Sequence, residues 1–156
     1  MAASEPWNQD RAHGIITMHT ALDGAALPIL HALQAVFGCI PLEAEPLVAE
    51  ALNISRAEVH GIVSFYHDFR RTPPGRHVLR VCRAEACQAV GGEAVADRAR
   101  RTLGVGWHGT SADGAVTLEP VFCLGFCAAG PAALLDGAPL VRLDAARIER
   151  MLASLT

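Results

Sequence analysis

The chain has 156 residues, of which 51% are hydrophobic and 19% charged, a balance typical of a folded protein and not of a disordered one. Its net charge is −3 at pH 7 and all its basic residues are arginine, which argues against a basic surface for nucleic acid. No apolar run approaches the ~18 residues of a membrane helix, so we expect no membrane insertion. A chain of this length buries about 70% of its unfolded surface, enough for one or two small domains.

Residues 1–74 are expected to form a small helical region. After a polar lead-in over Met1–Asp10, in which Trp7 is expected to pack on the surface, apolar residues recur at three-to-four spacing. They predict a helix that Asp23 caps and Gly38 ends.

Two further helices are expected before the middle of the chain. The first covers Glu45–Leu52, and Ser55 with Glu58 then forms a capping box that begins the second. The second helix is expected to place these residues on one apolar face: Val59, Ile62, Val63 and Tyr66.

These two helices, in ALNISRAEVHGIV, also resemble a helix-turn-helix that binds DNA. Residues 1–76 contain five arginines and eight acidic residues, however, and the second helix offers only Arg56 at its start. A protein that neutralises several phosphates needs a more basic surface. We therefore prefer a helical bundle that packs on a partner or on the second domain.

The run Thr72-Pro73-Pro74-Gly75 predicts a boundary between residues 1–74 and 75–156, because it favours a turn over a helix. The second half alternates strands and helices, which predicts an α/β layer. Its expected elements are strands over His77–Val81 and Val116–Val121, a helix over Gly91–Leu103 between them, a hairpin of Ala133–Leu135 and Leu140–Leu143 across Asp136-Gly137, and a last helix that Asp144 caps and that buries Ile148 and Leu152.

Four of the five cysteines form two close pairs, Cys82 with Cys87 and Cys123 with Cys127. Four thiolates suit zinc or an iron–sulfur cluster. Structural zinc pairs often have only two intervening residues, whereas these pairs have four and three. A two-iron cluster takes two thiolates on each iron, and the wider spacing favours it.

Other interpretations of the cysteines are weaker. Two disulfides are disfavoured because no secretory signal is recognised at the N-terminus, which leads us to expect a cytoplasmic protein with reduced thiols. A thioredoxin-type redox motif needs two intervening residues, which neither pair has. Cys39 has no second cysteine nearby and is expected to be a buried small hydrophobic residue.

The motifs VCRAEACQ and VFCLGFCAAGP resemble those of the thioredoxin-like [2Fe–2S] family, which includes the 24 kDa subunit of complex I and the gamma subunit of NAD-dependent formate dehydrogenases. The family pattern of Cys-x4-Cys and Cys-x3-Cys matches Cys82, Cys87, Cys123 and Cys127. CRAEACQ resembles the formate dehydrogenase branch more than complex I. The likeness extends to ISRAEVHGIVSFYHDF and covers nearly the whole chain.

The resemblance implies an α/β fold, a thioredoxin-like domain preceded by a small N-terminal helical bundle. It implies a [2Fe–2S] cluster held by the four cysteines, and a subunit that is not catalytic alone but exchanges single electrons with the FMN of an FMN- and NAD-binding flavoprotein subunit. The expected assembly is a multi-subunit NAD-dependent formate dehydrogenase, with complex I or an NAD-linked hydrogenase as the alternative. A zinc-stabilised interaction module is the alternative from another class.

The cluster's surroundings can also be anticipated. Val81, Phe122 and Phe126 are expected to exclude water from it and lower its reduction potential, near the ≈ −400 mV of plant-type ferredoxins. Backbone N–H groups around Gly125 and Gly130 would donate to sulfur and raise the potential.

One charge and one proline near the ligands also bear on the cluster. Arg83 would raise the potential by roughly 70 mV at ~10 Å and a dielectric of ~20, less any effect of the neighbouring Glu85. Thioredoxin-like folds often place a cis proline beside the active loops, and the resemblance suggests Gly130-Pro131 for it.

The histidines show no helical i, i+4 pair and none lies within a cysteine loop. A Rieske-like site would need two of them, but four cysteines leave no vacancy. We expect surface or structural roles for all seven: His13, His19, His31, His60, His67, His77 and His108. No phosphate-binding glycine loop or hydrolase elbow occurs.

Overall fold

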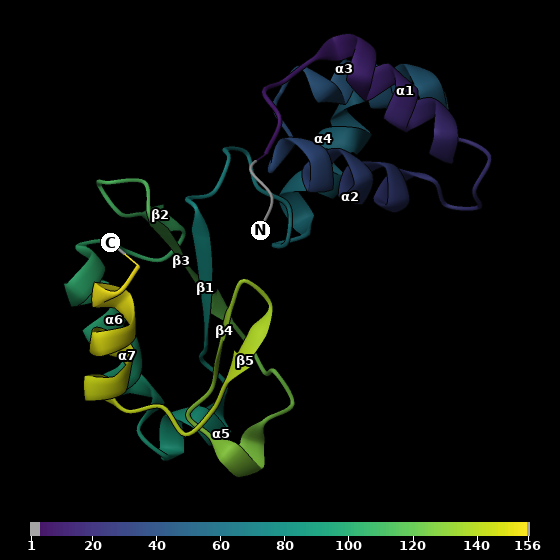
Figure 1. The fold of residues 1–156 in the computed structure, drawn as a ribbon. Helices are drawn as coiled ribbons and strands as arrows, with labels where there is room; N and C mark the ends of the chain where they lie inside the picture. Colours follow the sequence, from purple (N-terminus) through teal and green to yellow (C-terminus); the bar gives the residue numbers. More distant parts are fainter. Residues whose placement is uncertain (1–3, 156) are drawn as a thin grey trace. The chain divides into compact units, whose positions relative to one another are not determined.

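The computed structural model describes residues 4–155, which form two compact units that meet in the chain between Pro73 and Pro74. Figure 1 shows an all-helical unit followed by a unit of helices and sheet. The α/β fold class with helices at the N-terminus is therefore confirmed. Within residues 4–155, no helix combines the length and hydropathy of a membrane span.

The N-terminal unit consists of four helices around one apolar core. They are α1 (Gln9–His19), α2 (Ala26–Phe37), α3 (Ala44–Leu52) and α4 (Arg56–Phe65). Each contributes one apolar stripe, so that the core includes Ile16, Leu30, Phe37, Val48 and Val59.

Helix α1 is the one helix of this unit that the sequence did not predict. The side chain of Asn8 accepts a hydrogen bond from the Arg11 N–H at 2.8 Å and caps the helix, and Ala12, Ile15 and Ile16 are buried. The prediction of a polar lead-in was therefore wrong for its last residues, Gln9 and Asp10, which belong to the helix. The cap and the i, i+3, i+4 spacing of those three residues were the available signal.

Helix α2 begins later than predicted. Its N-terminal flanking residue is Ala25, which provides no side-chain cap, so the proposed cap at Asp23 was wrong. The predicted end is confirmed: Gly38 adopts a left-handed conformation with φ 75° and donates its N–H to the Gln34 carbonyl. Trp7 is partly buried against Phe37, with ring centroids 4.9 Å apart, so it belongs to the core instead of the surface.

Helix α4 begins with the predicted capping box. The Ser55 side chain accepts from the Glu58 N–H at 3.2 Å, and the Glu58 carboxylate accepts from the Ser55 N–H at 2.8 Å, which lowers the pKa of Glu58. Val59 and Val63 are buried as expected, but Tyr66 is exposed. Tyr66 leaves the apolar face because the helix has ended and its backbone is extended.

The C-terminal unit contains a five-stranded sheet in the order β2-β3-β1-β4-β5. The strands are β1 (His77–Cys82), β2 (Gly109–Thr110), β3 (Val116–Val121), β4 (Ala133–Leu135) and β5 (Ala138–Leu140). β1 and β3 are parallel, and the other pairs are antiparallel. The parallel pair brings the C-terminal ends of β1 and β3 to one edge of the sheet.

Two helices pack together beside this sheet, α6 (Gly92–Leu103) and α7 (Ala145–Ala153) (Figure 1). Leu79 and Val81 of β1, two residues apart, lie in one core with residues of both helices, because alternate strand residues share a face. Asp144 caps α7 by accepting from the Arg147 N–H at 2.7 Å, and Ile148 and Leu152 are buried, as predicted.

Three parts of this unit differ from the expectation. The hairpin turn at Asp136-Gly137 is confirmed, with φ 51° and 87°, but its second strand is Ala138–Leu140 and not Leu140–Leu143, because a two-residue turn places the strands directly beside it. Strand β2 was missed because it is only two residues long. The five-residue helix α5 (Glu85–Ala89) was also missed.

Candidate metal centre

Both cysteine pairs lie where the two parallel strands end. Cys82 is the last residue of β1 and is paired in register with Val121, the last residue of β3, and Cys123 follows two residues later. The backbone N–H of Arg83 donates to the Val121 carbonyl at 2.7 Å, which extends the pairing into the loops. The sheet therefore brings together two loops that are distant in sequence.

The first pair is buried: Cys82 is 3% exposed and Cys87 2%. Burial by itself would raise the pKa of Cys82, but hydrogen bonds from the Ala84 N–H, the Cys87 thiol and the N–H groups of Cys123 and Leu124 outweigh it and lower that pKa. Two of these donors belong to the second loop. Burial, followed by the hydrogen bond to Cys82, raises the pKa of Cys87.

The second pair is exposed, and its sulfurs lie 3.9 Å apart. Cys123 has a φ of 86°, a backbone angle that residues other than glycine rarely adopt and that costs on the order of 1–3 kcal/mol. The Gly125 N–H points to the Cys123 sulfur at 3.4 Å. The hydrogen bond and the charge of Cys123 raise the pKa of Cys127.

The donor set fits a centre with two metal ions. Two sulfurs on one tetrahedral ion with bonds of about 2.3 Å lie about 3.8 Å apart, close to the observed 3.9 Å between Cys123 and Cys127. The thiols occur two by two, Cys82 with Cys87 and Cys123 with Cys127, and hydrogen bonds that lower the pKa of Cys82 also stabilise its thiolate charge.

The apolar shell of the site differs from the expectation. Val81 is buried, but Phe122 is 76% exposed, so the proposed water exclusion by that ring was wrong for this chain. Phe126 is 36% exposed, so most of its surface is covered. Both rings belong to the loop that follows β3. The apolar neighbours of Cys82 and Cys87 are instead Ala132 and partly buried residues that include Leu124 and Val141.

The backbone donors were predicted in part. Gly125 donates to sulfur as expected, whereas the Gly130 N–H is directed to the Cys127 carbonyl at 3.4 Å. The N–H of Ala132 acts on Cys87 instead and lowers its pKa against the larger effect of burial. The Gly130-Pro131 bond is cis, and a Cβ at Gly130 would lie 3.4 Å from the Cys87 sulfur.

Arg83 has an ion-pair partner that the sequence did not reveal. Its guanidinium lies 2.8 Å from the Glu93 carboxylate in α6, and its carbon is 5.3 Å from the centre of the Trp107 ring. The expected offset by the sequence neighbour Glu85 stays a prediction. Neither Glu93 nor Trp107 was identified from the sequence.

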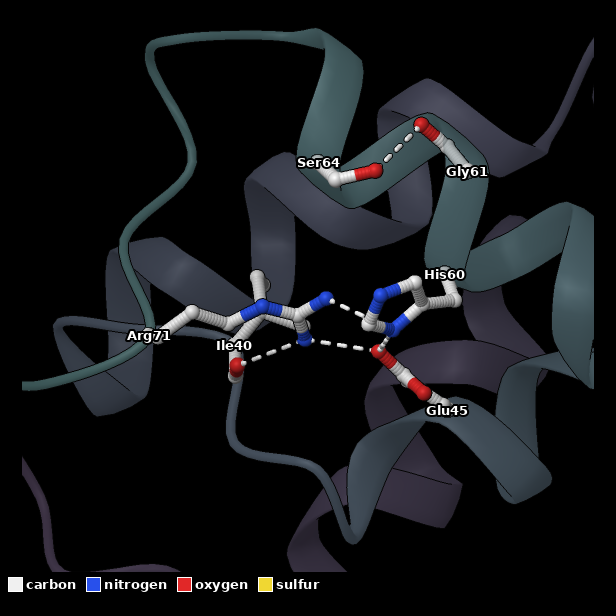
Figure 2. Close-up of polar contacts among 6 residues, drawn as sticks. All are labelled: Ile40, Glu45, His60, Gly61, Ser64 and Arg71. Atoms are coloured by element: carbon white, nitrogen blue, oxygen red, sulfur yellow. Dashed lines mark hydrogen bonds and ion pairs between the residues drawn. The ribbon is translucent and has the colours of Figure 1, made fainter.

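Several histidines pack or pair within their own unit. In Figure 2 the buried Glu45 carboxylate lies 2.7 Å from Arg71 and 3.0 Å from His60 Nδ1, which ties α3, α4 and the following loop together. His77 Nδ1 lies 2.6 Å from Asp136.

Cys39 is buried, as expected, and burial raises its pKa.

Two cysteine pairs at the ends of two parallel strands define an α/β protein whose four thiols are suited to a metal centre. Residues 12–156 match the model of the Thioredoxin-like [2Fe-2S] ferredoxin family, so the chain belongs to that family. This confirms the thioredoxin-like fold and identifies the cofactor as a [2Fe–2S] cluster.

The chain is also similar to individual proteins of known identity. One subunit of the NADH-quinone oxidoreductase of Pseudomonas aeruginosa is 39% identical over 112 residues, which are 72% of this chain and 68% of that protein. The HndA subunit of the NADP-reducing hydrogenase of Solidesulfovibrio fructosivorans is 28% identical over 131 residues, 84% of this chain and 77% of that protein. The crystal structure of an air-oxidized NAD+-reducing [NiFe]-hydrogenase aligns with a TM-score of 0.69 and 27% identity, covering 83% of this chain and 22% of that chain.

Proposed function

We propose that Cys82, Cys87, Cys123 and Cys127 hold the [2Fe–2S] cluster and that the chain is the electron-transfer subunit of a multi-subunit NAD-linked oxidoreductase. The observation that supports this most directly is the convergence of the two cysteine pairs at one edge of the sheet, where the parallel register pairs Cys82 with Val121, two residues before Cys123. A bound [2Fe–2S] cluster supplies a site that gains or loses one electron.

The chain's own groups have two roles towards that centre. The backbone N–H groups of Ala84, Cys123 and Leu124 lower the pKa of Cys82 and so favour its thiolate form, and they also favour added negative charge beside it. The buried first pair excludes water, which disfavours that charge. The exposed second pair provides the open side through which an electron can pass to a partner.

The open side has the character of a surface that a protein covers. Phe122 and Phe126 are exposed beside Cys123 and Cys127, and no charged residue occurs between Glu119 and Asp136. An exposed apolar patch next to a redox centre is typical of a binding surface. The partner we propose is an FMN- and NAD-binding flavoprotein subunit, whose flavin exchanges single electrons with the cluster.

The particular assembly is the finer part of the proposal. The loop CRAEACQ supports a formate dehydrogenase. The curated relatives support NADH-quinone oxidoreductase or an NAD(P)-linked hydrogenase. The oxidisable substrate of the purified complex, formate, NADH or hydrogen, distinguishes them. A cytoplasmic location for the subunit belongs to the same proposal.

The ligands are tested on the anaerobically purified chain by iron and sulfide analysis and by electron paramagnetic resonance before and after dithionite. We expect a silent oxidised sample and a near-stoichiometric [2Fe–2S] signal on reduction. Cys82→Ser should lose or alter that signal, whereas Cys39→Ser, the control at the cysteine outside the loops, should keep it. An unchanged spectrum in Cys82→Ser contradicts the ligand set, and silence in both states with bound zinc supports a structural module instead.

The partner surface is tested by co-purification of the tagged full chain with the flavoprotein, read as FMN content and as reduction of the cluster by NADH. Phe122→Ser should keep the cluster and lose FMN. Met18→Ser, which removes an exposed apolar side chain in the other unit, is the control and should retain FMN. Equal FMN in the two variants would contradict this surface.

A further inference from the structure

Arg83 is the residue after Cys82, and its backbone is held on both sides. Its N–H donates to the Val121 carbonyl at 2.7 Å, and its carbonyl accepts from the Gln88 side-chain amide at 2.6 Å. The second bond closes the loop that separates the two cysteines of the first pair. The side chain of Arg83 therefore starts from a fixed point beside a buried sulfur.

The guanidinium of Arg83 is held by an ion pair and by an aromatic ring. Its Nη2 lies 2.8 Å from one carboxylate oxygen of Glu93, and its Nη1 donates to the other at 3.2 Å, so the ion pair is bidentate. The carbon of the group lies 5.3 Å from the centre of the Trp107 ring, within cation–π distance. The Arg83 side chain is only 19% exposed, although that of Glu93 is 53% exposed.

Helix α6 supports the negative end of the pair. Glu93 is in the first turn of the helix, where the helix dipole favours a carboxylate. Trp107 is also approached by the guanidinium of Arg100, 6.0 Å from its centre. Two opposite charges are thus placed in a defined geometry next to the first ligand loop, and neither residue is among the proposed ligands.

We propose that the Arg83–Glu93 ion pair, oriented by Trp107, tunes the reduction potential of the cluster through two opposing charges. This inference rests on the proposed function, because it requires the cluster at Cys82 and its partners. Reduction adds one negative charge to the centre, so each member of the pair acts on the reduced state with opposite sign. Together they nearly cancel, and removal of either one leaves the other charge uncompensated.

The test is a potentiometric titration of the reduced cluster signal in the cluster-loaded full chain. Arg83→Gln leaves the Glu93 charge and should move the midpoint to more negative potential, and Glu93→Gln leaves the Arg83 charge and should move it to more positive potential. We expect at least a threefold change in the reduction equilibrium for each, about 28 mV for one electron. The double variant should return towards the wild-type value.

Three comparisons separate a charge effect from a structural one. Arg83→Lys keeps the positive charge, so its midpoint potential should stay close to that of the wild type. Added salt should shrink the single-variant shifts, because Glu93 is half exposed. Glu149→Gln, which breaks the matched Arg98–Glu149 pair between α6 and α7, is the control and should not move the midpoint.

The outcomes distinguish this inference from the function on which it rests. A chain that binds no iron or sulfide rejects the proposed function. A loaded cluster with unshifted midpoints, with shifts of the same sign in both single variants, or with no return in the double variant rejects the ion-pair inference alone. If Arg83→Gln does not load its cluster, Glu93→Gln is compared with Glu149→Gln alone. A positive shift of the midpoint in Glu93→Gln with none in Glu149→Gln supports the inference, and equal midpoints in the two reject it.

Discussion

The first cysteine loop is enclosed and the second is open, although both follow strands of the same sheet. Cys82 and Cys87 are buried among apolar neighbours and close to α6, whereas Cys123 and Cys127 are exposed. The first loop is restrained by contacts, since a Cβ at Gly92 would lie 2.6 Å from the Cys87 carbonyl oxygen. The second is restrained mainly by backbone conformation, with positive φ at Cys123 and Gly125.

This difference suggests a division of roles. A buried, contact-restrained loop anchors a cofactor to the core, because moving it would disturb a helix and the sheet together. An exposed loop with an unusual backbone presents the cofactor to a partner and can adjust when that partner binds. The following predictions test this contrast, beginning with the largest expected effect.

Serine substitution should be more damaging in the enclosed loop. We expect Cys87→Ser to lose the cluster almost completely, because buried residues around α5 cannot move to bring a shorter oxygen ligand to the metal. Cys127→Ser should retain a cluster with an altered paramagnetic spectrum, because its exposed loop can shift. Iron content and the spectra of both variants measure this. Equal cluster content in the two would remove the basis for the contrast.

Gly92→Ala should destabilise the C-terminal unit by about 3 kcal/mol, as overpacking does. The new methyl group would overlap the Cys87 carbonyl, so α6 or the first loop must shift. Denaturant unfolding of the chain and the fraction of cluster loaded are the measurements. Gly14→Ala is the control, because a Cβ there meets nothing within 4 Å and should slightly stabilise α1. A Gly92→Ala chain as stable as wild type would refute the close contact.

Asp136→Asn should cost about 2 kcal/mol at neutral pH and leave the potential of the cluster unchanged, because Asp136 pairs with His77 at the other end of β1 from Cys82. Burial would raise the pKa of Asp136, but the bonds from His77 and the Val78 N–H lower it overall. Its contribution is therefore complete above the unfolded pKa of about 3.9 and is lost as pH falls through the lower folded value. Unfolding from pH 5 to pH 2 should show the variant and wild type converging below about pH 4.

Gly125→Ala should cost only about 1 kcal/mol, the smallest of these effects, since the Cβ meets no atom within 4 Å and only the φ of 80° opposes it. The variant should load its cluster and unfold close to wild type. A loss as large as that of Gly92→Ala would show that contacts restrain the second loop as well.

The sequence anticipated those features that local chemistry determines. The Ser55 capping box, the glycine end of α2, the Asp136-Gly137 turn and the Asp144 cap each depend on a few neighbouring residues, and all four are present. The core strands β1 and β3 were predicted correctly because short apolar runs bounded by turn residues are typical of buried strands. Helix α1 was missed although Asn8 and its apolar spacing indicated it.

Only the tertiary structure decided what surrounds the cysteines. The spacing of Cys82, Cys87, Cys123 and Cys127 indicated a four-thiol centre, because sulfur chemistry and loop length are properties of the sequence itself. The exposure of Phe122 and the pairing of Arg83 with Glu93 depend on which element packs beside each loop. Such contacts join residues by their positions in space, and local residue preferences carry no information about them.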